Sequence, residues 1–463
     1  MALTALALAG CGSLVPPAGS PQAPLRENFR AETVAAETTL AETASEWDGF
    51  FTDERLRRVV GMALAGNRSL RASVAAVERA RAQYGITEAN RLPDVRGTVS
   101  ANEQRSDAGG RTSSYTASLG FAAWELDLFN RLGSLEGAAL ARYLAQQETQ
   151  RGVRLSLVAQ VAEAWLTLAA ESQRQRLAET LRNSQQQTLD LTERQYRLGA
   201  ASGLQRARAQ TAFEAARGEA ARSAAAVRQA RLQLELLAGQ PLPDTLLPGE
   251  QAAQATALPD IPAGLPATAL LQRPDLRAAE QQLQAAAFDV GAARAARFPR
   301  LTLTASAGQR SAELDGLLRS GSGFFSLLPS LDIPLFDAGA RQAQVEVTQA
   351  TRREVMANYE ATLQSAFREV ADALAVRDSL AERLAAQAAQ VEAAERSLSL
   401  ADQSYRLGAT SQLELLDAQR QLATARQGLV TLRQTEQANR VVLLRALGGR
   451  WTGAGRVLGS SAP

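Results

Sequence analysis

The chain has 463 residues with nearly balanced charge, 50 basic against 48 acidic, and only 5% aromatic residues, a composition that argues against nucleic-acid binding. It contains no histidine and a single cysteine, which excludes disulfides, histidine-based metal centres and histidine-dependent catalytic sites. No run approaches the ~20 apolar residues that a membrane helix needs, so the sequence predicts that this is not a helical membrane protein.

The N-terminus carries a pattern typical of exported lipoproteins. A short apolar segment, residues 3–10, ends at Leu8-Ala9-Gly10-Cys11 and is followed by a polar, proline-containing stretch. This resembles a bacterial lipoprotein signal, which implies that residues 1–10 are removed and that Cys11 is lipidated. Because no basic residue precedes the apolar core, we expect that the start lies too late in the gene or that the signal is trimmed. The alternative is a buried free cysteine at a helix end.

The next segment changes from helical to strand periodicity. Apolar residues spaced by three and four predict a helix over 68–90, which Pro93 ends. Residues 94–105 and 113–126 then alternate apolar with polar or small side chains, which predicts a β-hairpin with its tip at 108–110. Each strand is about 10 residues long, enough to cross a bilayer when tilted. We interpret the apolar face as facing lipid and the other face as facing water; the alternative is a soluble hairpin packed on helices.

A very long helix follows, from about 133 to 197, and it would span roughly 100 Å at 1.5 Å per residue. Its narrow apolar stripe is typical of a helix that packs only along its flanks. Gly199 stands where a left-handed cap residue is expected, and Ser202-x-x-Gln205 is a capping box that starts a return helix to about 238. The proline-rich stretch that follows, residues 240–272, is predicted to be a linker.

The same order of elements then returns, because the chain contains an internal duplication. Tyr196–Ala200 recurs as Tyr405–Ala409 at an offset of 209, and Arg91–Pro93 resembles Arg297–Pro299 at an offset of 206. The repeats are assigned to 67–239 and 273–448, after an N-terminal region 11–66 and before a tail, 449–463. The second repeat has a helix at 275–296, a hairpin within 300–336, a long helix at 339–405, and a return helix to 447 that the box Ser411-x-x-Glu414 opens. Four strands cannot close a barrel, so the chain must oligomerise.

Several segments together carry a resemblance to a known family. They are Leu8–Cys11, Trp47–Phe51 with Leu64 and Asn67, Arg273–Glu280, Phe298-Pro299, Phe367–Asp372 and Tyr405 through Asp417–Gln419. The chain resembles the TolC-type outer-membrane factors of their lipoprotein branch, the NodT-like efflux lipoproteins. The resemblance implies a mainly α fold with a membrane β-barrel: a homotrimer whose chains share a 12-stranded β-barrel and an α-barrel.

The resemblance also implies a function and partners. The trimer would be a passive exit duct in the Gram-negative outer membrane, with no cofactor except the lipid on Cys11. Its partners would be a periplasmic adaptor and an inner-membrane pump driven by protons. The adaptor would contact the turns at Leu198, Gly199, Leu407 and Gly408. Lacking histidine and methionine-rich tracts, the sequence favours organic cargo over metal ions.

The narrow inner end of such a duct should lie at the helix turns. Glu414 and Asp417 lie three residues apart on one helical face, and the family's acidic aperture residues map onto them. Threefold symmetry would form a ring of six carboxylates, although capping alone also explains Glu414 and a helix N-terminus favours Asp417. The first repeat has Gln205 and Arg208 at the matching positions. We expect arginines to pair with the acids and hold the aperture closed, so that removing Asp417 raises conductance and reduces cation preference. The expected gate residues are Asp417, Glu414, Tyr405, Arg420, Arg208 and Arg206.

Two other functions compete with a channel. A structural periplasmic coiled-coil lipoprotein would explain the helices and Cys11 but gives no role to hairpins of membrane length. A hydrolase that uses carboxylates alone would need paired acids in a cleft, and the sequence shows no such pair. We therefore expect no enzymatic activity.

Overall fold

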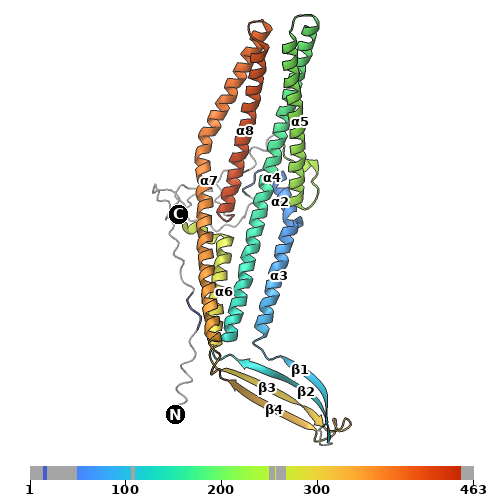
Figure 1. Ribbon diagram of the computed structural model, residues 1–463, viewed down its shortest axis with the longest axis vertical. Helices are drawn as coiled ribbons and strands as arrows, with labels where there is room; N and C mark the ends of the chain where they lie inside the picture. Colours follow the sequence, from blue (N-terminus) through green and yellow to red (C-terminus); the bar gives the residue numbers. More distant parts are fainter. Residues whose placement is uncertain (1–13, 18–48, 106–109, 250–255, 257–266, 450–463) are drawn as a thin grey trace, which may run out of the picture. The chain divides into compact units, whose positions relative to one another are not determined.

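The computed structural model describes residues 14–17, 49–105, 110–249, 256 and 267–449 (Figure 1). Cys11, the predicted signal peptide, much of the linker and nearly all of the tail lie outside these residues. The chain forms two compact units that cut across both repeats. The first unit contains residues 74–150 and 275–363 with the segment 14–17, and the second contains the described parts of 24–73, 151–274 and 364–463. The boundaries assigned to the repeats remain predictions.

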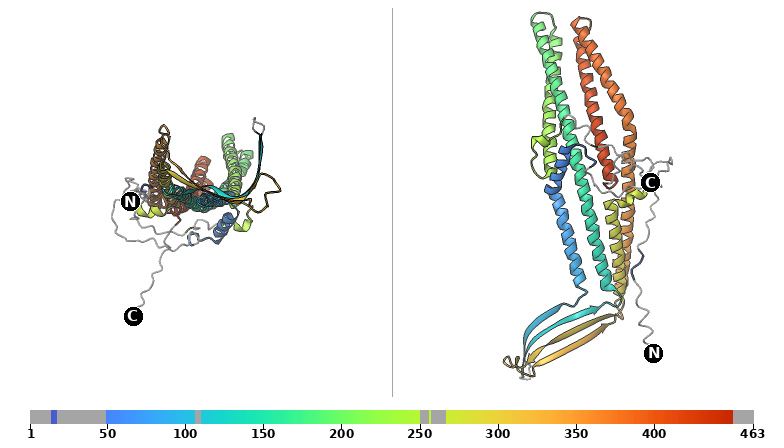
Figure 2. Two further views of the ribbon diagram at one scale, coloured as in Figure 1. Left: turned by 90° about the horizontal axis from the view of Figure 1, so that it is seen from below. Right: turned by 180° about the vertical axis from the view of Figure 1, so that it is seen from behind.

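The first unit contains one four-stranded antiparallel sheet, which Figure 2 shows as a single curved layer. The strands β1 (Val95–Arg105), β2 (Arg111–Leu126), β3 (Arg300–Ser311) and β4 (Gly323–Asp332) pair in chain order. Each repeat supplies one hairpin, as predicted, and the pairing of β2 with β3 joins the two. Within the described sheet, β1 and β4 are edge strands.

The register separates apolar from polar side chains. Val95, Phe121, Ala305 and Leu327 stand opposite one another in one row across the four strands. The next row contains Arg96, Gly120, Ser306 and Ser326. Successive rows point to opposite faces because the side-chain period of a strand is two. One face of the sheet is therefore apolar across all four strands, and the other is largely polar or small.

The polar face depends on two glycines and a bulge. A Cβ at Gly120 would overlap the carbonyl oxygen of Ala305, and one at Gly308 would overlap that of Ala117, so both positions require glycine. The β2–β3 register shifts between Phe121 and Trp124, where Ala123 has a positive φ of 51°. Such a bulge increases the local twist of the strands, which a sheet needs if it is to curve toward closure.

The long helices start at aspartate caps. In α4 (Arg131–Arg197), the carboxylate of Asp127 accepts hydrogen bonds from the backbone N–H groups of Arg131 and Gly133, at 2.6 and 2.8 Å. In α7 (Ala340–Arg406), Asp337 accepts them from Gly339 and Arg341, at 3.0 and 3.2 Å. The bond from the Arg341 N–H is the main reason that the pKa of Asp337 is lowered. Each strand-to-helix connection thus ends in an acidic side chain that satisfies helix N–H groups.

The second unit has a core built around α2 (Glu54–Gly66), a helix that the sequence analysis did not identify. Trp165 of α4 is fully buried in this core with Phe50, Leu56 and Val60, and Leu234 of α5 (Gly203–Ala238) completes it. The signal for α2 was present, because Asp53 caps the helix and Leu56, Val59, Val60 and Ala63 follow at helical spacing.

One apolar stretch corrects an expectation from composition. The helix α4 is long enough to cross a membrane and includes an 18-residue stretch that is apolar enough to do so. Of that stretch, 56% is buried within the chain. Leu157, Val161 and Trp165 on α4 belong to the core with α2. These apolar residues of α4 therefore serve packing within the chain.

Polar side chains cap the ends of both return helices in equivalent ways. At the end of α5, Asn67 Nδ2 donates to the carbonyl oxygen of Leu237 at 3.0 Å, just before α3 (Arg68–Ala89) begins. At the end of α8 (Gln412–Ala446), Arg273 Nη1 donates to that of Ala446 at 2.8 Å, just before α6 (Pro274–Ala295). These bonds satisfy carbonyls that a helix end leaves unpaired. The remaining described helices are short 3₁₀ segments, Asp244–Leu246 and Ala267–Gln272.

Candidate aperture at the helix turns

The two helical turns have the local geometry that the repeat predicts. Gly199 and Gly408 adopt positive φ angles of 75° and 72°. Both capping boxes form: Ser202 and Gln205 exchange bonds of 3.2 and 2.7 Å, and Ser411 and Glu414 exchange bonds of 3.4 and 3.2 Å. The carboxylate of Glu414 is therefore engaged with the backbone N–H of Ser411 within its own turn.

The tips of both turns expose apolar side chains. Leu198 is 83% exposed and Leu407 is 84% exposed, each directly before the turn glycine. Exposed apolar side chains at equivalent tips are typical of a surface that another protein covers. Contact of Leu198, Gly199, Leu407 and Gly408 with an adaptor stays a prediction.

Asp417 binds to partners on its own helix. It forms an ion pair with Arg420, and its Oδ2 accepts a hydrogen bond of 2.6 Å from Gln421 Nε2. Asp417 and Glu414 line one open groove of about 540 Å³, which Ser397, Ala401, Thr410, Leu413, Ala418 and Gln421 also line. The structure thus brings the two acids together and confirms Arg420 as a partner of Asp417.

The other expected partners lie elsewhere. Arg206 forms an ion pair of 3.5 Å with Glu193, and its guanidinium lies over the ring of Tyr196 at 5.4 Å, so it binds across the first hairpin and not to the acids. Among the described residues, neither Arg208 nor Tyr405 has a hydrogen bond or ion pair with Asp417. The sequence led us to expect one network of arginines around the acids. Within one chain the structure instead has two local networks, one around Arg206 and one around Asp417. The reason is helical spacing, which gives Asp417 partners three and four residues away.

The helices α4 and α5 form one helical hairpin, and α7 and α8 form the other. Polar contacts between α4 and α8 join the two hairpins. Gln412 Nε2 of α8 donates to Thr192 Oγ1 of α4 at 2.8 Å, and both residues are almost fully buried. Seven residues later in α8 and seven residues earlier in α4, Gln185 Nε2 donates to Gln419 Oε1 at 2.8 Å. We call these contacts, with those of Arg174 described next, the α4–α8 seam.

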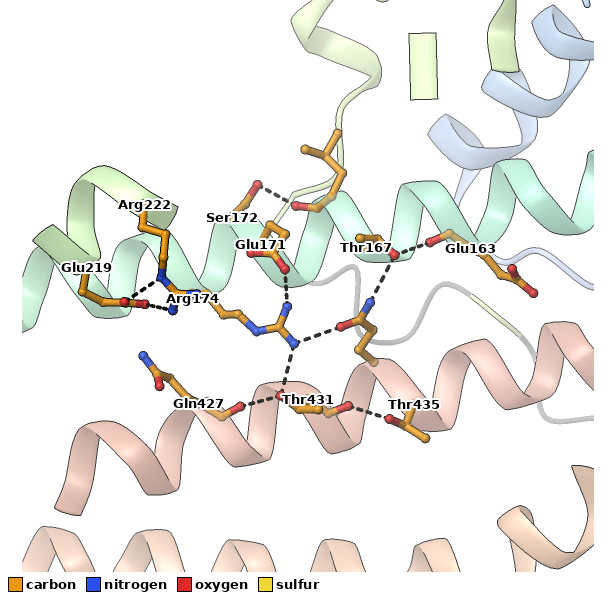
Figure 3. Close-up of polar contacts among 12 residues, drawn as sticks. Glu163, Thr167, Glu171, Ser172, Arg174, Glu219, Arg222, Gln427, Thr431 and Thr435 are labelled. Carbon is orange, nitrogen blue, oxygen red and sulfur yellow. Dashed lines mark hydrogen bonds and ion pairs between the residues drawn. The ribbon is translucent and has the colours of Figure 1, made fainter. Parts of the chain in front are cut away.

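Figure 3 shows the part of the seam around Arg174. Arg174 of α4 donates to Thr431 Oγ1 and Gln434 Oε1 of α8, at 3.1 and 3.0 Å, and its other Nη bonds to Glu171 at 2.5 Å. Gln434 Nε2 in turn donates to Thr167 Oγ1 at 3.1 Å. The sequence analysis did not identify this interface, although the heptad spacing of Gln412 with Gln419 and of Thr192 with Gln185 could have indicated it.

Glu163 of α4 gives a pH-dependent prediction. Burial raises the pKa of its carboxyl, and the charge of Arg445 only partly opposes this. The stability that the protonated Glu163 contributes is fully present below the ordinary glutamate pKa and is lost as pH rises through the raised pKa of the folded state. The reason is that Glu163 of the unfolded chain loses its proton at a lower pH than Glu163 of the folded chain. We expect Glu163→Gln to raise the thermal midpoint by a few degrees at pH 7.5 and to change it little at pH 4, measured by circular dichroism. Equal shifts at both pH values would contradict a buried, ionising carboxyl; Glu179→Gln on the same helix is a control.

Comparisons with known proteins identify the family. The family model described as outer membrane efflux protein matches residues 59–240 and 265–449. The chain is 37% identical over 462 residues to the probable efflux pump outer membrane protein TtgC of Pseudomonas putida, covering 97% of this chain and 95% of TtgC. It is 37% identical over 456 residues to the cation efflux system protein CusC of Escherichia coli, covering 96% and 97%.

The solved structures agree with this assignment. The open-state structure of the Neisseria gonorrhoeae MtrE outer membrane channel superimposes with a TM-score of 0.85 at 33% identity, covering 94% of this chain and 98% of MtrE. The predicted fold class, mainly helical with four membrane strands in each chain, is confirmed. The chain therefore belongs to the outer membrane efflux protein family and is an outer-membrane channel component of an efflux system.

Proposed function

We propose that three copies of this chain form one passive exit duct, with twelve strands in a shared barrel. The observation that supports this most strongly is the sheet itself. Its register gives one apolar face, while β1 and β4 remain edge strands. An open edge is not tolerated in lipid because its backbone N–H and C=O groups would have no partner. Pairing of β1 with β4 of another copy satisfies both edges.

Cysteine crosslinking tests this assembly. Single cysteines on β1, from Thr98 to Ala101, are combined in turn with single cysteines on β4, from Ser326 to Leu328, and oxidised in native outer membranes. We expect at least one combination to give covalent dimers and trimers on denaturing gels, without larger species. Combinations of β1 with β3 should not crosslink between copies, because β3 is paired on both sides. A ladder that ends at dimers would overturn the trimer.

The partners and the cargo are also part of the proposal. We infer that Cys11 carries a lipid, that the exposed turns at Leu198 and Leu407 contact a periplasmic adaptor, and that a proton-driven inner-membrane pump supplies the energy of this tripartite system. The absence of histidine from the sequence and its three methionines support organic cargo over metal ions. We infer no catalytic activity, since the relatives are efflux channel components.

The gate is proposed to have two parts with different roles. Asp417 and Glu414 line one groove, and in a trimer they would supply a ring of acids that selects for cations. The bonds of Asp417 stay within α8, so breaking them does not separate helices. The contacts of the α4–α8 seam do cross between the hairpins, so opening that separates the hairpins of one chain would have to rearrange them.

Thr192→Val tests the seam. The substitution keeps the side-chain volume but leaves the buried Nε2 of Gln412 without its acceptor, which should cost about 1–3 kcal/mol. We expect more frequent or longer openings in planar bilayers, with unchanged ion selectivity. Thr180→Val makes the same change on the same helix at an exposed position, and among the described residues its hydroxyl bonds to the backbone carbonyl of Arg176 and not to α8, so it is the control. If both variants open alike, the seam does not hold the closed state.

A further inference from the structure

The polar face of the sheet carries an arginine near the hairpin turns. Both hairpins turn at the end of the sheet that lies away from the helices (Figure 1). Arg310 of β3 stands at that end, where it pairs with Thr116 of β2. It belongs to the polar face because it is an even number of residues from Ser306 in the same strand and the side-chain period is two. In the proposed barrel, Arg310 therefore faces the interior.

Arg310 is set apart from the other charges on this face. The other charged residues of the described strands on the polar face lie at the helix end of the sheet, and they are Arg96, Glu125, Arg300 and Asp332. Those four balance in sign, and Arg300 binds Glu125 at 2.8 Å. In the turn after β3, Asp315 pairs with Arg319. Among the described residues, no carboxylate forms an ion pair with Arg310, so its charge is not neutralised locally.

Two neighbours hold the guanidinium of Arg310. Its Cζ lies over the ring of Phe324, 4.9 Å from the ring centre, and its Nε donates to Thr116 Oγ1 at 3.4 Å. Phe324 of β4 lies opposite Gly308 on the polar face and is half-buried, whereas Phe325 on the apolar face is 73% exposed. An arginine that stacks on an aromatic ring keeps its Nη groups at the edge of the stack, where they can bind a ligand.

The duplication shows that this cation is particular to the second repeat. At the offset of 206, β3 aligns with β1, and the residue that corresponds to Arg310 is Gln104. Gln104 also lies on the polar face, since it is an even number of residues from Arg96 in its strand. A trimer would therefore bring three copies of Arg310, each stacked on a phenylalanine, to the hairpin end of one lumen, with neutral amides at the equivalent positions of the first repeat.

We propose that Arg310, held by Phe324, forms a binding site for organic anions, carboxylates or sulfonates, at the hairpin end of the barrel lumen. This rests on the barrel proposed above, because closure is what makes the polar face an interior. The planar guanidinium presents paired N–H groups that match the oxygens of a carboxylate or sulfonate. Three such charges in one lumen attract anions, and thus act in the opposite sense to the acids Asp417 and Glu414.

Ion selectivity gives the first test. Arg310→Gln places the residue of the first repeat in the second, and Arg105→Gln removes the same charge from a strand end on the opposite face of the sheet. From reversal potentials at low salt, we expect the preference for cations to rise about twofold or more in Arg310→Gln and to change little in Arg105→Gln. Equal changes in the two variants, or none in Arg310→Gln, would overturn the site.

Binding of a defined anion gives the second test. Naphthalene disulfonate should block the single-channel current of the wild-type protein, and the concentration for half block should rise about fivefold or more in Arg310→Gln. Phe324→Leu keeps the charge but removes the ring that orients it, so we expect a smaller rise in that variant. Absence of block in the wild type, or equal block in the wild type and Arg310→Gln, would contradict an anion site at Arg310.

A measurement that needs no current separates this site from the channel proposal. Calorimetry on detergent-solubilised trimers measures binding of naphthalene disulfonate directly, and heat-modifiable migration checks that Arg310→Gln assembles. Trimers that bind the anion through Arg310 but do not conduct would contradict only the channel. Trimers that conduct, and that bind the anion equally well with and without Arg310, would contradict only the anion site.

Discussion

Leu327→Arg is expected to prevent stable assembly in the outer membrane. Leu327 lies in the middle of β4, on the apolar face, and pairs with Ala305 of β3. Arginine at the bilayer midplane on a lipid-facing strand position costs about 2–4 kcal/mol, and a trimer would carry it three times. Heat-modifiable migration on gels and the yield of protein in outer-membrane fractions measure the effect.

The neighbouring residue provides the control. Ser326 pairs with Ser306 in the polar row, so Ser326→Arg places the same side chain on the opposite face. We expect this variant to assemble normally and to change conductance, because its charge faces the water-filled interior. If Ser326→Arg blocks assembly and Leu327→Arg does not, the assignment of the two faces is reversed. If both assemble, the sheet does not face lipid.

Asp417→Ala is expected to reduce the preference for cations about threefold or more, measured from reversal potentials in planar bilayers. The substitution removes a carboxylate and also leaves Arg420 without its ion-pair partner, so the groove gains positive charge. The effect should be greatest at low salt, where charges are least screened. Since the bonds of Asp417 do not join two helices, we expect the release of the closed state, as more frequent or longer openings, from Thr192→Val instead.

Two further variants make this result specific. Arg208→Gln changes the equivalent position of the first repeat, where the side chain is exposed, and should leave cation preference nearly unchanged. Glu414→Gln keeps a side chain that can complete the capping box, as Gln205 does in the first repeat, so it isolates the charge of Glu414 from its structural role. Unchanged selectivity in Asp417→Ala, or an equal change in Arg208→Gln, would remove the acids from the aperture.

The long helices and the strands could be predicted because their signals are local. Alternation in 301–308 reflects the two faces of β3, and the glycines at 199 and 408 with their capping boxes determine where helices turn. The helix α2 was missed because it is short and lies next to a region identified only by resemblance. Its apolar spacing was readable, but its role depends on Trp165, more than a hundred residues away.

The partners of individual side chains could not be predicted in this way. The i,i+3 spacing of Asp417 and Arg420 could be read from the sequence, but the pairing of Arg206 with Glu193 on the other helix of its hairpin could not. Likewise, Gly85 and Gly291 occupy the same position in the two repeats, and only the folded chain shows that Val15 covers one of them. Such contacts depend on which surfaces distant segments present to each other.

By itself, the sequence determined the duplicated order of helices and strands, the two faces of the hairpins and the positions of the turns, since each follows from backbone preferences and side-chain periodicity within a few residues. The tertiary structure alone decided which strands pair across the repeats, which polar side chains join α4 to α8, and where residues 14–17 are held. These depend on contacts between residues up to 335 positions apart, which local patterns do not encode.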